Sequence, residues 1–234
     1  MIAFSMTGFA QEKNNVLSKK EKKEGWVLMF DGKTTDGWRG YNKTAFPEKG
    51  WAVEEGTLHV IGSSRGEAGG GGGDLLYDKK FRNFELSLEW KVSEGGNSGI
   101  FYLAQEIPGE PVWKSAPEMQ ILDNEKHPDA KLGVDGNRAA GSLYDLIPGD
   151  FKAVKPAGEW NKVSVLVYKG TVVHKVNGKT VLEYHLWTED WNKMVLNSKF
   201  KDYEWFLKTA EEGYIVLQDH GDDVWFRNIK IKEM

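Results

Sequence analysis

The stretch Phe84-Glu85-Leu86-Ser87-Leu88-Glu89-Trp90-Lys91-Val92 alternates apolar and polar residues along its whole length. In an extended strand, successive side chains point to opposite faces. One face of this segment is therefore apolar throughout, whereas the other carries charges and a serine. The pattern predicts a strand that covers a hydrophobic core on one side only.

Further short strands are predicted on both sides of this segment, with turn residues between them. Asn177-Gly178, for example, is a strong hairpin signal. The predicted strands are 26–30, 51–53, 57–61, 84–92, 100–104, 118–123, 142–147, 162–168, 171–176, 179–184, 214–218 and 224–232. One short helical insertion is expected near 188–210, with Thr188 as its cap. This pattern favours an all-β fold, a two-sheet antiparallel sandwich of the jelly-roll type.

The composition excludes several classes of function. A net charge of -4 and a pI near 5.8 argue against nucleic acid as a partner, because phosphate binding needs a basic surface. The 234 residues include no cysteine, which excludes disulfides, thiolate catalysis and thiolate metal sites. Ten Trp, eight Tyr and eleven Phe exceed an ordinary aromatic content, and indole faces stack on sugar rings as well as in cores. The excess gives weak support for a carbohydrate ligand.

The N-terminal 24 residues differ from the rest of the chain. Residues 1–10 are apolar with small residues at Gly8 and Ala10, as at the end of a secretory signal, and predict export to the periplasm or beyond a bacterial cell. Residues 11–24 are polar and charged and are expected to form a disordered leader. The single folded domain is then 25–234. No run is long enough to span a membrane, and no obligate protein partner is evident.

The segment Glu118-Met119-Gln120-Ile121-Leu122-Asp123 combines an apolar face with a carboxylate-amide face. Met119 and Ile121 point one way, and Glu118 and Gln120 point the other. Asp123 joins the polar pair only if a β-bulge inserts one extra residue. Such a strand suits a sheet with a core behind it and a polar ligand in front, although an ordinary solvated face has the same pattern.

Other polar residues within apolar strands are candidates for the same cleft. They are Asn97, Ser98, Tyr144, Gln218 and Arg227, and a structural salt bridge explains Arg227 equally well. His220 follows a strand end beside an amide and an acid, where a polar turn is the alternative explanation. His174 lies in an alternating hairpin and is expected on the surface.

Seven segments carry a resemblance to a known family. They are Gly96–Phe101, Glu118–Asp123, Gly141–Asp145, Gly158–Asn161, Val176–Lys179, Leu217–Gly221 and Val224–Ile229, in this order. Together they resemble the 3-keto-disaccharide hydrolase domain family of secreted bacterial proteins. The resemblance covers roughly residues 25–234. It implies a concanavalin-like jelly roll and cleavage of glycosidic bonds in sugars oxidised at C3.

The implied chemistry needs one base and several donors. A ketone at C3 acidifies the proton on C2, so a general base can remove it and the enolate can expel the glycosidic oxygen. Glu118 or His220 would be the base. Lys199, Arg227, Asn97 and Gln120 would supply donors around the ketone oxygen, and a divalent cation could replace some of them.

Two alternatives remain open at this point. Glucanases of the same fold carry Glu-x-Asp-x-x-Glu, and Glu118-x-Gln120-x-x-Asp123 has this spacing with two substitutions. Direct hydrolysis by Glu118 and Asp123 would need their carboxyl groups about 5–5.5 Å or about 6.5–9.5 Å apart. The other alternative is a lectin-like module that binds sugar without cleaving it. The catalytic candidates are therefore Glu118, His220 and Asp123.

Overall fold

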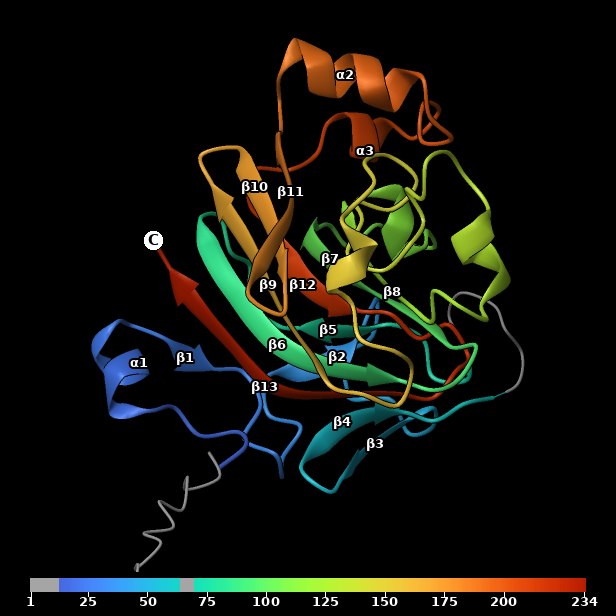
Figure 1. Cartoon of the computed structure of the whole chain (residues 1–234). Coiled ribbons are helices and arrows are strands. Elements are labelled where there is room, and N and C mark those ends of the chain that lie inside the picture. Colours follow the sequence, from blue (N-terminus) through green and yellow to red (C-terminus); the bar gives the residue numbers. More distant parts are fainter. Residues whose placement is uncertain (1–12, 64–69) are drawn as a thin grey trace, which may run out of the picture.

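Two antiparallel sheets pack face to face in the computed structural model, which describes residues 13–63 and 70–234 (Figure 1). The large sheet has the order β11 (Lys179–His185), β10 (Thr171–Val176), β9 (Asn161–Tyr168), β6 (Phe84–Val92), β13 (Val224–Glu233), β4 (Thr57–Val60) and β3 (Trp51–Glu54), with β1 (Val27–Leu28) paired to β13. The small sheet has the order β2 (Trp38–Gly40), β5 (Leu75–Tyr77), β12 (Tyr214–Leu217), β7 (Asn97–Ala104) and β8 (Glu118–Leu122). The predicted all-β sandwich is confirmed.

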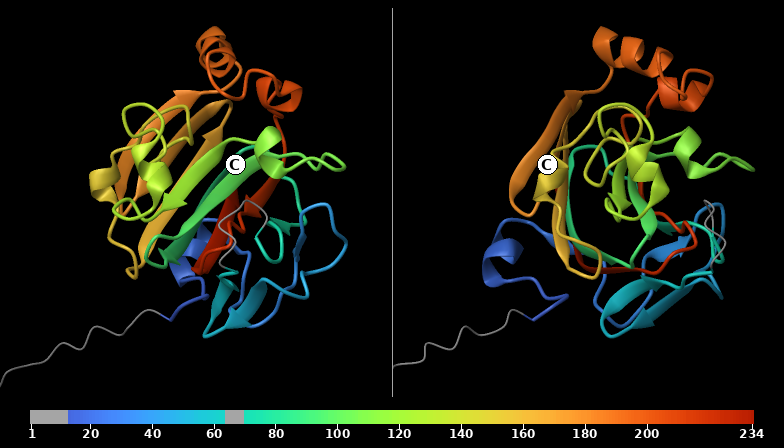
Figure 2. Two further views of the ribbon diagram at one scale, coloured as in Figure 1. Left: turned by 90° about the vertical axis from the view of Figure 1, so that its right-hand side faces the viewer. Right: turned by 45° about the vertical axis from the view of Figure 1, so that its right-hand side comes forward.

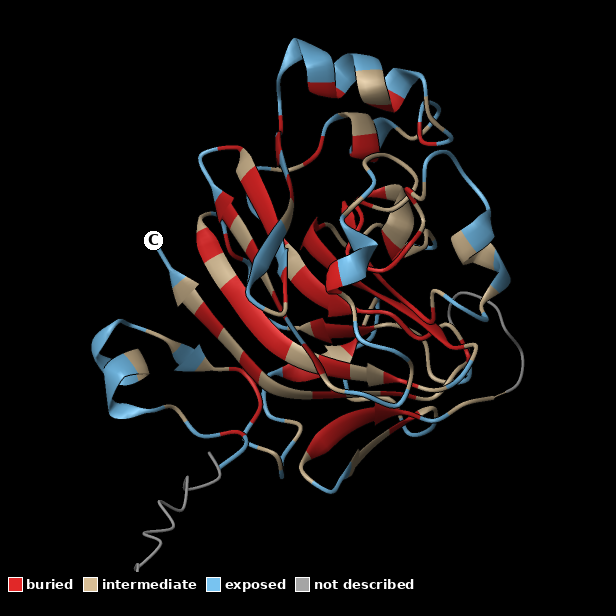
Figure 3. Ribbon diagram, viewed as in Figure 1, coloured by how far each residue is buried: buried red, intermediate tan, exposed pale blue. Residues whose placement is uncertain are grey.

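The main core lies between the two sheets. On β6, Phe84, Leu86, Leu88, Trp90 and Val92 are all buried in it. Buried and half-buried residues alternate along β6 and β13, as the colouring in Figure 3 shows. The predicted strand with one apolar face is confirmed for β6, which lies in the middle of the large sheet.

The predicted strands match the structure with three exceptions. The segment 142–147 is a loop with only isolated bridges, so its prediction as a strand is wrong. The short strands β2 and β5 were not predicted, because three residues are too few for alternation to be visible.

The N-terminal segment is more ordered than its composition suggests. Residues 19–23 form helix α1 (Lys19–Lys23), which has a capping box formed by Ser18 and Glu21. Asn15 exchanges hydrogen bonds with Asn228 on β13. The prediction of a disordered leader is therefore wrong for residues 13–24, whereas the signal-like residues 1–10 lie outside the described part of the chain.

Two short helices cover one end of the sandwich. They are α2 (Glu189–Leu196), capped by Thr188 as predicted, and α3 (Glu204–Leu207). Both views in Figure 2 place them at the end of the molecule opposite α1. The remaining short turns are the 3₁₀ helices η1 (Val112–Lys114), η2 (Pro128–Lys131) and η3 (Phe151–Ala153). Among residues 13–63 and 70–234, no helix is long and apolar enough to cross a membrane.

Candidate active site

A pocket of about 230 Å³ lies on the face of the small sheet that points away from the large sheet. Its floor comes from β7, β8 and the end of β12. Its walls come from η1, the loop after β8 and the segment between α2 and α3. The residues that line it are Asn97, Trp113, Glu118, Gln120, Tyr144, Lys199, Phe200, Tyr203, Gln218 and His220.

Strand parity places Glu118 and Gln120 on this floor. Their neighbours Met119 and Ile121 are buried in the main core. The carboxylate of Glu118 and the amide of Gln120 must therefore point to the other face of the sheet, away from that core. The pairing of β8 with β7 is regular and sets Glu118 opposite Phe101 and Gln120 opposite Gly99. The predicted split of this strand into an apolar and a polar face is therefore what the structure shows.

Gly99 provides the room that the Glu118 carboxyl occupies. A Cβ atom added at Gly99 would lie 2.1 Å from Oε1 of Glu118, far inside van der Waals contact. Gly99 lies in a regular strand, so its backbone conformation does not require glycine. A glycine is needed here because the Glu118 carboxyl comes so close.

Replacing Gly99 by alanine should therefore displace the Glu118 carboxyl. A shift of about 1 Å can cost roughly 10²-fold in rate, so we expect kcat/KM to fall by about that factor. Gly71→Ala is a suitable control, since the nearest atom to its new Cβ is Ser63 Cβ at an ordinary 3.5 Å. Steady-state kinetics and a thermal melt of both variants would check this. Equal activity of Gly99→Ala and wild type would contradict the placement of the carboxyl.

Buried polar atoms without partners converge on the pocket. Asn97 Oδ1, Gln120 Oε1 and His220 Nδ1 are buried and accept or donate no hydrogen bond within the described part of the chain. Leaving such atoms unpaired away from water costs about 1–3 kcal/mol each. Their clustering at one cavity indicates that a polar ligand completes their hydrogen bonds.

The Glu118 carboxyl is held partly protonated by its surroundings. It is only 7% exposed, and burial raises its pKa from 4.5 to about 8. The charge of Lys199 acts in the opposite direction and lowers this pKa. A carboxyl with a pKa close to neutral is suited to accept and return a proton at physiological pH.

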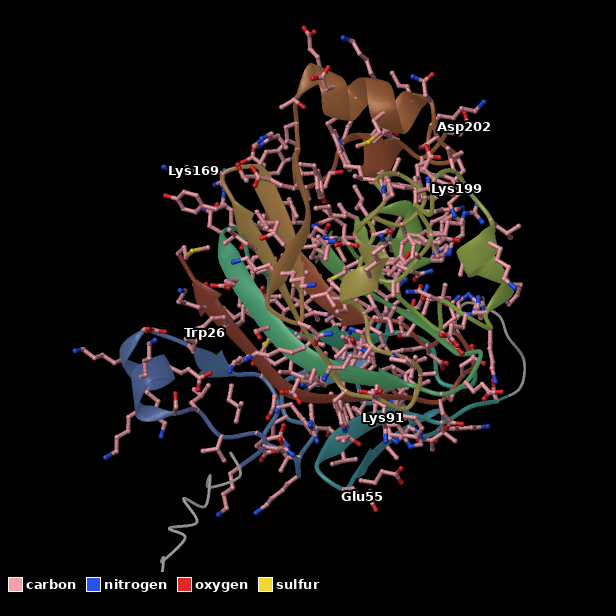
Figure 4. The ribbon with its side chains drawn as sticks, in the orientation of Figure 1. Trp26, Glu55, Lys91, Lys169, Lys199 and Asp202 are labelled. Atoms are coloured by element: carbon pink, nitrogen blue, oxygen red, sulfur yellow. The ribbon has the colours of Figure 1, made fainter. Side chains whose placement is uncertain are left out.

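A charged network forms the wall next to Glu118. The Lys199 ammonium lies 4.0 Å from the centre of the Tyr144 ring and 4.0 Å from Asp145 Oδ2. Arg138 also packs on the Tyr144 ring. The Arg138 guanidinium forms salt bridges with Asp129 at 2.8 Å and with Asp145 at 2.5 Å. Desolvation lowers the pKa of Lys199. Figure 4 shows Lys199 at the end of the molecule that carries α2, far from Lys91 on the large sheet.

Another part of the pocket wall is aromatic. Trp113 from η1 and Tyr203 from the end of the α2–α3 segment meet edge to face, with ring centres 5.3 Å apart. Phe200 lies beside Lys199 and stacks on Phe206. A pocket with a polar floor and one aromatic wall matches the two faces of a pyranose ring, one rich in hydroxyl groups and one rich in C–H groups.

Comparison with known proteins assigns the chain to a family. The sequence profile of the 3-keto-alpha-glucoside-1,2-lyase-like domain matches residues 25–232. The chain belongs to this family. The resemblance drawn from the seven segments is thereby confirmed, and with it the expectation that the chain is an enzyme.

Relatives of this lyase-like domain include a protein named as a hydrolase and proteins of solved structure. A 3-keto-disaccharide hydrolase of Bacteroides thetaiotaomicron is 54% identical over an alignment of 228 residues, which covers 89% of this chain and 78% of the relative. A candidate glycosyl hydrolase from Parabacteroides distasonis is 31% identical, with a TM-score of 0.82 over 95% of this chain and 100% of that one. A second structure from the same organism is 24% identical with a TM-score of 0.68, covers 89% of this chain and 99% of its own, and shows the fold alone.

Seven of the ten predicted site residues of the lyase-like domain meet in this one pocket. They are Asn97, Glu118, Gln120, Tyr144, Lys199, Gln218 and His220. They come from strands and loops up to 123 positions apart in sequence, and no local pattern linked them. Their roles in catalysis and binding remain predictions.

Asp123 is not among the residues that line the pocket. It follows the end of β8, and no bulge interrupts the pairing of β8 with β7. Its carboxylate accepts hydrogen bonds from the backbone N–H groups of Gly95 and Glu125, at 2.7 and 3.0 Å. The structure therefore gives Asp123 a turn-stabilising position, and we leave it out of the proposed mechanism.

Ser98 and Arg227 also lie elsewhere. The Ser98 hydroxyl is fully buried and donates to the backbone carbonyl of Gln218. Arg227 belongs to β13 of the large sheet, where its Nε lies 2.8 Å from Glu89 Oε2 and its guanidinium packs on Trp160. The sequence explained Arg227 equally well by a structural salt bridge and by ligand binding. The structure shows the salt bridge.

Three aromatic lining residues were not predicted, namely Trp113, Phe200 and Tyr203. They lie in 3₁₀ and irregular segments. The sequence of such segments has no regular apolar period that would distinguish a ring facing the ligand from a ring in the core. Their only signal was the high overall aromatic content. Among the described residues, no group of three or more His, Asp or Glu side chains is arranged to hold a metal ion.

Proposed function

We propose that the protein cleaves the glycosidic bond of 3-keto-glycosides, with Glu118 as the general base that removes the C2 proton. The single observation that carries this proposal is a buried carboxyl of raised pKa on a pocket floor whose amide oxygens lack partners. The name of the Bacteroides thetaiotaomicron relative and the family description support the same substrate class.

The proposed reaction uses four side chains of the pocket. Glu118 takes the C2 proton, and the resulting enolate expels the glycosidic oxygen from C1, which forms a C1–C2 double bond. His220 donates a proton to the departing oxygen. Lys199 and Tyr144, which line the same pocket as Glu118, would donate hydrogen bonds to the ketone oxygen and its enolate charge.

Addition of water completes hydrolysis in the proposed scheme. Water adds to C1 of the unsaturated product and gives its proton to His220, and the carboxylic acid of Glu118 returns a proton to C2. The sum is 3-keto-glycoside plus water to 3-keto-sugar plus alcohol, and the protein is unchanged. If the unsaturated sugar left before water added, the same residues would catalyse a lyase reaction instead of hydrolysis.

The size of the pocket supports a small sugar as the substrate. A volume of 230 Å³ holds about eight water molecules at roughly 30 Å³ each, which is close to the room that one pyranose ring needs. We therefore propose that one ring enters and that the leaving group extends over the aromatic wall. Disaccharides and short glycosides fit this arrangement better than the interior of a polysaccharide.

Replacing Lys199 by methionine should shift the pH dependence of the reaction. The Lys199 charge lowers the pKa of Glu118, so its loss should raise that pKa further and move the alkaline rise of kcat/KM to higher pH. A pH profile of kcat/KM would measure this. Lys193→Met on the exposed face of α2 is the matched control, and an unshifted profile in Lys199→Met would remove Lys199 from the site.

An aglycone-release assay tests the proposed function directly. The protein is incubated with a glucoside and with its 3-keto derivative, each with and without chelator. We expect release from the keto derivative alone, and the chelator arm shows whether a divalent cation takes part. Release from the plain glucoside alone would favour direct hydrolysis, and binding without any release over hours would favour a lectin-like module.

A further inference from the structure

A chain of buried polar groups runs through the core beneath the pocket. His174 on β10 of the large sheet is completely buried, so its prediction as a surface residue is wrong. Its Nδ1 lies 3.1 Å from the carbonyl oxygen of Gly141, and its Nε2 lies 2.8 Å from the Tyr102 hydroxyl. That hydroxyl is in turn 2.6 Å from the hydroxyl of Tyr184 on β11.

The direction of each hydrogen bond in this chain follows from chemistry. A carbonyl oxygen can only accept, so Nδ1 of His174 must carry the proton that it donates to Gly141. Burial lowers the pKa of His174 to about 4, so the ring is neutral and Nε2 accepts from Tyr102. The Tyr102 oxygen then accepts from Tyr184. One tautomer satisfies all three groups.

Gly141 begins the loop that forms one wall of the pocket. Its N–H donates to the carbonyl of Gln120 at 2.9 Å, and the N–H of Tyr144 donates to the carbonyl of Glu118 at 3.0 Å. The loop thus runs beside β8 like an additional strand, next to both floor residues. Through His174, the opposite sheet anchors this loop.

The other end of the chain leads to the second wall. The Tyr184 ring stacks on Trp191 of α2, with ring centres 5.5 Å apart, and Trp191 stacks on Phe206 of α3 at 6.0 Å. Phe206 stacks on Phe200, which lines the pocket beside Lys199, at 4.1 Å. The same set of contacts therefore joins the loop at Gly141 to the segment between α2 and α3.

We infer that His174 is a positioning residue for the pocket, whose Nδ1–H fixes the 141–144 loop against β8, with Tyr102 holding the imidazole ring in that orientation. Without the Tyr102 hydroxyl, Nε2 of His174 loses the donor that holds the ring from its other side and is left unpaired in the core. The ring can then turn away from the Gly141 oxygen, and the anchor of the loop is weakened. The effect on turnover rests on the proposed function, whereas the effect on the loop does not.

Hydrogen exchange of the loop tests the inference without substrate. In Tyr102→Phe we expect faster exchange of the Gly141 and Tyr144 amides, because the anchor of their loop is weakened. Tyr41→Phe is the matched control, since it also removes one hydrogen-bonded hydroxyl, which here donates to the backbone carbonyl of Gln105, and since Tyr41 does not line the pocket. Unchanged exchange in Tyr102→Phe would overturn the inference.

Two substitutions of His174 separate anchoring from mere packing. The amide nitrogen of His174→Asn can replace Nδ1 and donate to Gly141, whereas that of His174→Gln reaches toward Tyr102. We expect slower loop exchange and at least tenfold higher kcat/KM in the Asn variant than in the Gln variant, even at equal melting temperature. The reverse order would contradict the inference. No turnover by the wild type would instead count against the proposed function, and the exchange result would still decide the role of His174.

Discussion

Replacing Glu118 by glutamine should lower kcat/KM for a 3-keto-glycoside by about 10²–10⁴-fold, the usual contribution of a general base. Glutamine fills nearly the same volume but cannot take a proton from C2. The fold should tolerate the change well, because a buried carboxyl with a pKa near 8 is replaced by a neutral amide. Steady-state kinetics on the keto derivative, together with a thermal melt, would measure both effects.

The control for this variant is Glu89→Gln. Glu89 is a carboxylate on the large sheet, paired with Arg227 and absent from the pocket. The same chemical change should therefore leave kcat/KM close to that of the wild type. Activity of Glu118→Gln within a few-fold of wild type would remove Glu118 from the mechanism.

The pH dependence of the reaction should show the raised pKa of Glu118. The base is active only when ionised, so kcat/KM should rise about tenfold per pH unit below its pKa of about 8 and level off above it. Measured between pH 6 and pH 9.5, this is a change of about 10²-fold. A flat profile across pH 6–8 would show that the group removing the proton has an ordinary carboxyl pKa or is another residue.

The same shift predicts a change in stability with a definite sign. Between pH 4.5 and pH 8 the folded state keeps the Glu118 proton, whereas the unfolded state releases it. The unfolded state therefore binds fewer protons, and this group makes the free energy of unfolding fall as pH rises through that window. The difference in unfolding free energy between wild type and Glu118→Gln should grow in favour of the variant toward pH 8. No such growth in denaturant titrations at pH 5 and pH 8 would contradict the raised pKa.

The sequence allowed much of the fold to be predicted, because alternation is a local property. Strands such as β6 and β8 each have one face in the core, so their apolar positions recur at every second residue. The wrong strand predictions fall in segments where alternation does not distinguish a strand from a loop. The 142–147 loop runs beside β8 with strand-like backbone hydrogen bonds, but it forms isolated bridges instead of a continuous strand.

The candidate site was predicted in part for the same reason. Glu118 and Gln120 were placed on one polar face by parity alone, and the structure puts both on the pocket floor. The prediction for His174 was wrong because its ring is covered on the core side of β10 by Tyr102, which lies 72 positions away in sequence. Arg227 was assigned to the site because one sequence does not show which sheet a strand joins.

A deuterium label at C2 of the 3-keto-glycoside tests the central claim most directly. If Glu118 removes the C2 proton before the glycosidic bond breaks, the labelled substrate should release its aglycone more slowly than the unlabelled one, or lose its label to water before release. We expect one of these two results in the wild type, and neither release nor label loss in Glu118→Gln. Release at an unchanged rate with the deuterium retained at C2 of the sugar product would contradict the central claim.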